Sequence, residues 1–136
     1  MKKSVIILLI IIQNSLSAQS VYDALIEKTQ TVAQSQAMIS QILSYFAKQR
    51  PDIPQKVWQE IQSEIDYQSF VTEVKELYRQ YYTETEAQEI IDTIDQYGIN
   101  AVTYKPEVTE AMYELGRKFG RQIGEHIKEK LKELGY

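Results

Sequence analysis

LYRQYYTETEAQEIIDTIDQYGINAVTYKP, residues 77–106, contains the boundaries of three helices. Residues 83–86, Thr-Glu-Thr-Glu, have the form of a capping box, in which the Thr83 hydroxyl accepts the N–H of Glu86 and the Glu86 carboxylate accepts the N–H of Thr83. An apolar stripe at helical spacing follows: Ala87, Ile90, Ile91, Ile94 and Tyr97. Because Gly98 stops this stripe and Pro106 suits a first helical turn, we expect one helix to end just before Thr83, a second to begin there, and a third to begin at Pro106.

The same periodicity on either side predicts the other helices. We expect them over residues 20–28, 32–48, 54–65 and 67–82, with the last helix over 106–134. Val32 begins the expected inner face of the second of these, and Tyr81 and Tyr82 lie about 100° apart, so only one of them is expected to be fully buried. Residues 99–104 fit either a short helix or an extended link. No segment alternates with period two, which predicts an all-α fold: a single bundle of five to six antiparallel helices.

These motifs also resemble a known family. The aromatic pair before residues 83–86, the capped helix, Gly98 and the Lys105-Pro106 restart are similar to the bacterial family catalogued as domain of unknown function 2059. The resemblance covers roughly residues 70–127, and the family's Ser-Pro pair before the glycine is Asp95-Gln96 here. The resemblance implies an all-helical exported protein, and it implies no activity.

The first eighteen residues are typical of a secretory signal peptide. Lys2 and Lys3 are followed by an eight-residue apolar run over 5–12 and by small residues that end at Ala18. Eight apolar residues are too few to span a membrane, which takes roughly 20. There is no cysteine, so the chain has neither a lipoprotein cleavage site nor disulfides. We therefore expect a cleaved signal at 1–18, one helical domain over 19–136, and a periplasmic or secreted protein without a lipid anchor.

Charge is distributed unevenly along the chain. The whole sequence has 15 basic and 19 acidic residues, a balance that argues against general nucleic-acid binding. Residues 60–95 contain ten acids against Lys75 and Arg79. Residues 115–132 reverse the balance and contain Arg117, Lys118, Arg121, Lys128, Lys130 and Lys132. Two interpretations remain open: the two regions attract each other within the fold, or each is a solvated face.

The last helix has an apolar stripe and a glycine stripe. The apolar stripe consists of Met112, Leu115, Phe119, Ile123, Ile127 and Leu131. Beside it, Gly116, Gly120 and Gly124 recur every four residues, and each costs up to about 1 kcal/mol relative to Ala in a helix. We expect this glycine face to be packed tightly against another helix of the domain, with a dimer seam as the alternative. The charged residues between the glycines exclude a membrane span.

Few residues of the sequence are of the types that form catalytic or metal-binding sites. His126 is the only histidine, which excludes a His-rich metal site, and the absence of cysteine excludes thiolate sites. His126 could touch a metal together with Glu125 and Glu129, but we expect it to be solvated near a helix end. The carboxylates over residues 84–95 spread over more than one helical face, and several serve the helix N-terminus. No alternating oxygen loop suggests calcium, and no Gly-rich phosphate loop is present. No cofactor or metal is expected.

Three function classes follow in order of support. The first is a non-catalytic module that binds another exported or cell-envelope protein, with Arg117, Lys118 and Arg121 as its interaction face. The second is a membrane-surface or lipid-handling protein that uses the basic amphipathic last helix. The third is a carboxylate hydrolase built on Glu86 or Asp92. The first two are distinguished by whether the domain buries the apolar stripe of the last helix.

Overall fold

A computed structural model describes residues 21–136, and in this range all regular secondary structure is helical, with no strand. Residues 21–28 form a helix, followed by α2 (Thr31–Gln49), α3 (Gln55–Glu64), α4 (Tyr67–Tyr81), α5 (Glu84–Tyr97), the short 3-10 helix η1 (Ile99–Ala101) and α6 (Pro106–Glu133). The expected all-α bundle is confirmed. The predicted signal segment, residues 1–18, lies outside the described residues.

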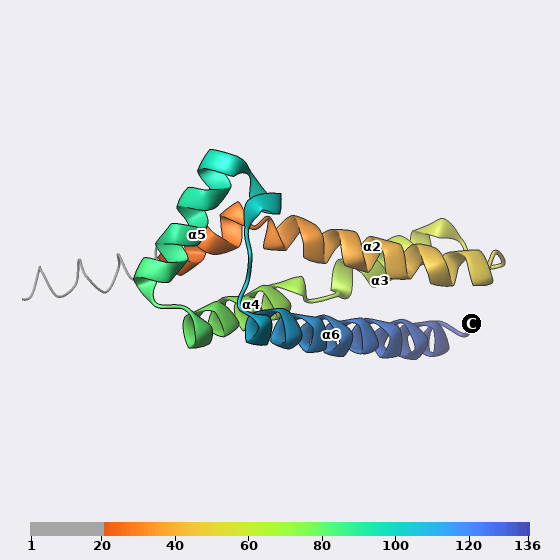
Figure 1. The fold of residues 1–136 in the computed structure, drawn as a ribbon. Helices are drawn as coiled ribbons and strands as arrows, with labels where there is room; N and C mark the ends of the chain where they lie inside the picture. The colour runs from red at the N-terminus through yellow and green to blue at the C-terminus, as the bar shows by residue number, and fades with distance from the viewer. Residues whose placement is uncertain (1–20) are drawn as a thin grey trace, which may run out of the picture.

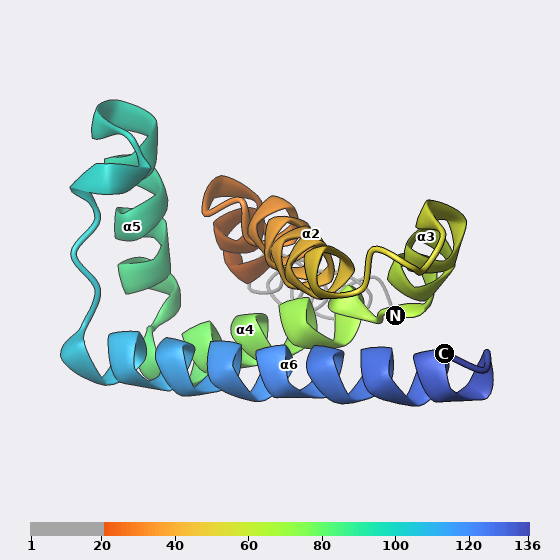
Figure 2. The same ribbon diagram turned by 90° about the vertical axis from the view of Figure 1, so that its right-hand side faces the viewer.

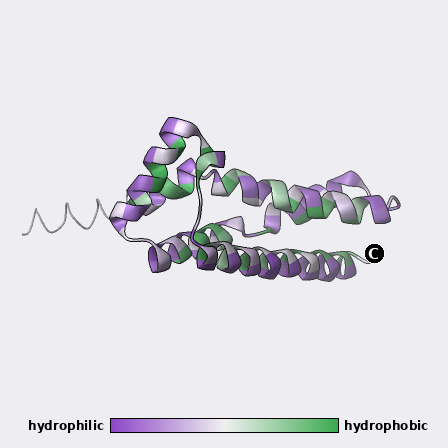
Figure 3. Cartoon of the chain, viewed as in Figure 1, coloured by the Kyte–Doolittle hydropathy of each residue, from purple (hydrophilic) through white to green (hydrophobic). Residues whose placement is uncertain are grey.

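Two layers of helices form the body of the molecule. α4 and α6 lie side by side in one layer, and α2 crosses above them (Figure 1). α3 packs against α2 near the end of the molecule where the chain terminates, whereas α5 lies at the other end and stands steeply to α6 (Figure 2). The helices alternate hydrophilic and hydrophobic residues along their length, as amphipathic helices do (Figure 3).

Local signals in the sequence explain most helix boundaries. Asp66 caps α4 by accepting the N–H of Ser69 at 3.1 Å. Gly98 ends α5 with φ at 87°, in the region that favours glycine. Pro106 occupies the first turn of α6, where its missing N–H costs no hydrogen bond. Residues 99–104 combine both expected conformations, because η1 is followed by an extended link to α6.

The core consists of two hydrophobic clusters, which lie one after the other along α6. The first joins the helix over 21–28 to α4, α5 and the start of α6, around Leu25, Tyr78 and Val108. The second joins α2 and α3 to the rest of α6, around Trp58 and Ile127. Phe70 packs against both clusters and stacks on Phe119 with ring centroids 4.4 Å apart. Trp58 is 7% exposed, as the apolar pattern of α3 predicts.

Three expectations about side-chain burial are settled by this packing. Only one tyrosine of the pair is buried, and it is Tyr82, at 6% exposure. Val32 is exposed at 37%, so its expected inward position is wrong: α2 instead turns Thr31 and Ser35 inward, four residues apart in line with Ile39. Tyr97 is also exposed, at 69%, because the last turn of α5 extends past the core.

Candidate functional site

The three basic residues predicted as an interaction face all lie on the exposed side of α6, but they differ in their partners. Lys118 donates to Glu73 of α4 at 3.2 Å, and Arg117 donates to Glu114 at 3.1 Å on its own helix. Arg121 has no carboxylate oxygen within 4.0 Å in the described part of the chain. The attraction between the acidic middle and the basic last helix is therefore realised at Lys118 and at Lys130, which pairs with Glu64 at 3.0 Å, while Arg121 keeps its charge for solvent or a partner.

An open groove runs beside these residues between α4 and α6. Its floor is apolar, with Leu77 and Tyr81 from α4 and Ala111 and Leu115 from α6. Its rim is charged and includes Glu76, Glu114, Lys118 and Arg121. On the outer face of α6, Tyr113 is 66% exposed. The guanidinium of Arg117 lies 5.8 Å from the centroid of the Tyr113 ring. The outer face of α6 thus carries an exposed tyrosine and arginines, and the groove with its apolar floor lies on the flank of the helix toward α4.

The glycine face of α6 is turned toward another helix of the domain, α2, as expected at Gly116 and Gly120, but the packing there is not tight. A Cβ built on Gly116 would lie 4.0 Å from Met38 Cε, and one on Gly120 would lie 4.0 Å from Ile42 Cδ1, both on α2. These are ordinary van der Waals separations, and a Cβ on Gly124 would meet nothing within 4 Å. The expected tight packing is therefore wrong. Side chains of α2, not its backbone, occupy the space above the glycines.

A cleft lies between α2, α4 and α6. It has a volume of about 490 Å³, and the η1 segment and Tyr104 close one side of it. Thr31, Ser35 and Met38 of α2 face Val108, Met112 and Gly116 of α6 across this space. This cleft is not among the sites predicted from the sequence. The signal for it is the buried stripe of α2: counted backwards from Leu43 and Ile39 in steps of four, it reaches the polar residues Ser35 and Thr31.

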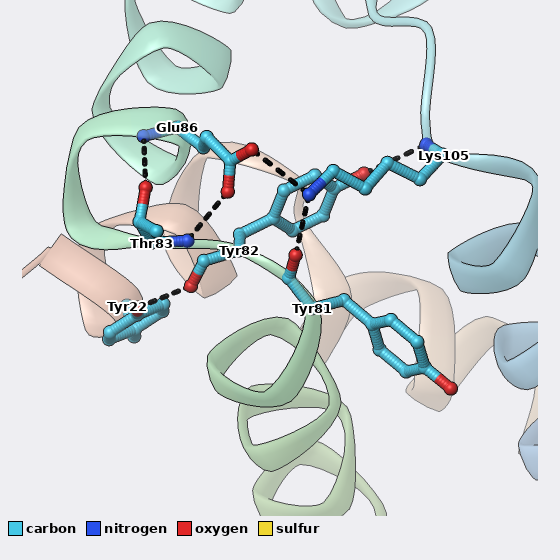
Figure 4. Close-up of polar contacts among 6 residues, drawn as sticks. All are labelled: Tyr22, Tyr81, Tyr82, Thr83, Glu86 and Lys105. Carbon is cyan, nitrogen blue, oxygen red and sulfur yellow. Dashed lines mark hydrogen bonds and ion pairs between the residues drawn. The ribbon is translucent and has the colours of Figure 1, made fainter.

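The Glu86 carboxylate is fully engaged in structural contacts at the α4–α5 junction (Figure 4). Its Oε2 accepts the Thr83 N–H at 2.8 Å, and the Glu86 N–H donates to the Thr83 hydroxyl at 3.2 Å, so the predicted capping box is confirmed. Its Oε1 accepts from Lys105 Nζ at 2.9 Å. The Thr83 backbone N–H and then Lys105 hold the pKa of Glu86 below its usual range. A carboxylate stabilised in its charged form this way is a weak proton acceptor.

The same junction is tied together by two tyrosines and Lys105. The Tyr22 hydroxyl donates to the buried Tyr82 carbonyl at 2.6 Å. The Lys105 N–H donates to the Tyr82 hydroxyl at 3.0 Å, and Lys105 Nζ donates to the Tyr81 carbonyl at 2.8 Å (Figure 4). This network joins the first helix, the end of α4 and the residue before α6, so these groups hold the fold together.

The remaining candidate residues are dispersed. Asp92 accepts from Gln88 at 2.9 Å on the exposed side of α5. The His126 side chain is partly solvated, at 31% exposure, but its Nε2 is buried with no hydrogen-bond partner among the described residues. This atom lies 3.6 Å from a Glu64 oxygen that also accepts from Lys130 at 3.0 Å. No group of three or more His, Asp or Glu in residues 21–136 is arranged to hold a metal ion.

The helices of residues 21–136 include none that is long and apolar enough to cross a membrane. The apolar stripe of α6 is covered by the domain itself: Phe119, Ile123, Ile127 and Leu131 are all buried against α2 and α3. A membrane-surface or lipid-handling role would require this stripe to be open, so the structure does not favour that function class.

Comparison with known proteins adds no relative to this description. No family model matches the chain, and no curated protein or solved structure is significantly similar to it. The resemblance to domain of unknown function 2059 therefore stays a prediction from the residues that carry it.

Proposed function

We propose that this chain is an exported, non-catalytic module that binds another exported or cell-envelope protein through the outer face of α6. The export signal is the predicted one at residues 1–18. The observation that carries the proposal is the exposed Tyr113–Arg117 pair on the outer face of α6, together with Arg121 at the rim of the α4–α6 groove.

The composition of this face is that of a protein interface. Tyrosine and arginine are enriched at the energetic centres of interfaces, because each combines a large apolar contact area with a directed polar group. Tyr113 is 66% exposed, so its ring gains little from the fold and can gain much from a partner. The groove on the α4 side of the helix, which Arg121 borders, adds apolar contact through the half-buried Leu115.

The charges of the face select an acidic partner surface. Arg121 has no carboxylate of the described chain within 4.0 Å, so a partner carboxylate can pair with it without displacing an existing ion pair. The contacts of Lys118 with Glu73 and of Arg117 with Glu114 are exposed ion pairs, which contribute little to stability and are easily exchanged. Gly116 and Gly120 face α2, so the proposal does not use a dimer through the glycines.

Site-specific photocrosslinking tests the proposal. The photoreactive residue p-benzoylphenylalanine replaces Tyr113, and in matched controls it replaces Tyr45 of α2 or Tyr97 of α5, which are exposed to similar extents of 63% and 69%. Expressed in the native cell, the Tyr113 variant should give one dominant adduct of defined mass that both controls lack. Equal adducts at all three positions, or none at Tyr113, would contradict the proposal.

A further inference from the structure

The cleft between α2, α4 and α6 is a second feature, separate from the outer face of α6. It opens where the two hydrophobic clusters meet: Tyr78 and Val108 belong to the first, Met38 packs against the second, and Phe70 packs against both. A volume of about 490 Å³ falls within the roughly 300–1,000 Å³ typical of small-molecule sites.

The wall of the cleft carries no charge. Within the described part of the chain, none of its lining residues is Asp, Glu, Lys, Arg or His, although charged residues make up 25% of the sequence. A charged ligand would lose its hydration on entering and would find no counter-ion there. The lining therefore selects an uncharged molecule.

Hydroxyl groups give the wall its polar contacts. The buried hydroxyls of Thr29 and Thr31 lie 2.8 Å apart, and Ser35, fully buried, donates to the Val32 carbonyl at 2.7 Å. Each hydroxyl oxygen can still accept a further hydrogen bond. The phenols of Tyr78 and Tyr104 also line the cleft and, as ordinary tyrosines do, stay protonated at neutral pH and can donate. The cleft thus offers both hydroxyl donors and hydroxyl acceptors.

The apolar part of the wall is adaptable and is kept open by a glycine. Met38 and Met112 line the cleft with flexible side chains that adjust to irregular shapes. Gly116 also lines it, and a Cβ there would meet only Met38 Cε, at 4.0 Å. No tight packing excludes a larger residue, so the consequence of glycine at position 116 is open space inside the cleft.

We propose that this cleft binds an uncharged, largely apolar small molecule that carries a hydroxyl or carbonyl oxygen. Phe70 and the two methionines contact its apolar body, and the hydroxyl groups around Thr31 and Ser35 bind its oxygen. This site is independent of the protein-binding face, because the residues of the cleft and those of the α4–α6 groove do not overlap.

Two fluorescent probes that differ by one charged group test the ligand class. N-phenyl-1-naphthylamine is uncharged, and 1-anilinonaphthalene-8-sulfonate has the same ring system with a sulfonate. Titrated into the purified full-length mature chain, the uncharged probe should bind saturably with a blue-shifted emission, and the sulfonate should bind at least about tenfold more weakly. Equal affinity for both probes would overturn the proposal.

Variants on one helix locate the probe. Gly116→Leu fills the cleft and should weaken binding of the uncharged probe at least about tenfold. Gly124→Leu, on the same helix but outside the cleft and with nothing within 4 Å of its Cβ, should leave binding unchanged. If Gly116→Leu fails to fold by circular dichroism, Thr109→Trp at the exposed rim obstructs the same space from outside. Wild-type affinity in the folded cleft variant, or an equal loss in Gly124→Leu, would show that the probe binds elsewhere.

Discussion

Glu86 and Lys105 are 19 residues apart in sequence and form an ion pair of 2.9 Å that joins the first turn of α5 to the residue before α6. The same carboxylate closes the capping box with Thr83, and the same ammonium lies 4.9 Å from the centre of the Tyr82 ring. One acidic residue that the sequence marks as a helix cap therefore also anchors the residue that precedes α6.

This relationship predicts a pH-dependent stability. The folded pKa of Glu86 lies below its ordinary value of 4.5, so its contribution to folding is complete above pH 4.5 and is lost as the pH falls through the lowered value. Glu86→Gln should be less stable than the wild type at pH 7 in urea denaturation, and the difference should shrink progressively below pH 4.5. A difference that is the same at pH 3 and pH 7 would contradict the assignment.

The cap itself can be separated from the ion pair. Thr83→Ala removes the hydroxyl that accepts the Glu86 N–H and should lower the free energy of unfolding by about 1 kcal/mol. Thr85 lies two residues further along the chain and is exposed, so Thr85→Ala is the matched control and should change stability little. Equal effects of the two substitutions in urea denaturation would argue against the capping box.

Tyr22 provides a buried hydrogen bond that spans 60 residues of sequence. Its hydroxyl donates to the Tyr82 carbonyl at 2.6 Å, and Tyr22 is 7% exposed. Tyr22→Phe should lower the free energy of unfolding by about 1–2 kcal/mol, because it leaves a buried carbonyl without its donor. Tyr45→Phe, at an exposed site, is the control. Equal melting temperatures for Tyr22→Phe and the wild type would remove this bond from the account.

The glycines of α6 should tolerate alanine. Ordinary separations at Gly120 and open space at Gly124 leave room for a Cβ, so Gly120→Ala and Gly124→Ala should each stabilise the protein by roughly 0.5–1 kcal/mol through helix propensity. Thermal unfolding measures the change. A lower melting temperature in either variant would mean that a closer neighbour, such as a second copy of the chain, packs on this face.

How much the sequence predicts depends on how local the signal is. The capping box, the proline start of α6 and the burial of Trp58 each depend on residues within one or two helical turns, and all are confirmed. How closely the glycine face packs and which way Val32 points depend on how α2 crosses α6, which no single helix encodes. Both expectations are wrong for that reason.

The cleft and the Lys105 contacts show the same limit more clearly. The cleft is formed by residues from Thr29 to Gly116, in four separate segments of the chain. Lys105 looks in sequence like an ordinary residue before a proline, and only the fold brings its ammonium to Glu86 and the Tyr81 carbonyl. The periodicity of a helix gives its inner face, but not the neighbour that this face meets.

The export prediction concerns residues outside those described. If residues 1–18 are a cleaved signal peptide, N-terminal sequencing of the protein from the periplasm or medium should begin at Gln19. Substituting the small residue before the cut, Ala18→Arg, should leave the precursor uncleaved. A mature protein that retains Met1 would reject the signal peptide.

The most direct test of the binding proposal uses the partner that photocrosslinking identifies. Its affinity is measured for the Arg121→Glu variant and for a control variant with the same charge reversal at Lys56, Lys56→Glu. Arg121 and Lys56 are both exposed and have no carboxylate within 4.0 Å in the described chain, but Lys56 lies on α3, away from the α4–α6 groove. Measured by surface plasmon resonance at fixed salt, Arg121→Glu should weaken binding at least about tenfold, mainly through slower association, and Lys56→Glu should leave it unchanged. Wild-type affinity in Arg121→Glu, or the same loss in Lys56→Glu, would contradict binding through the outer face of α6.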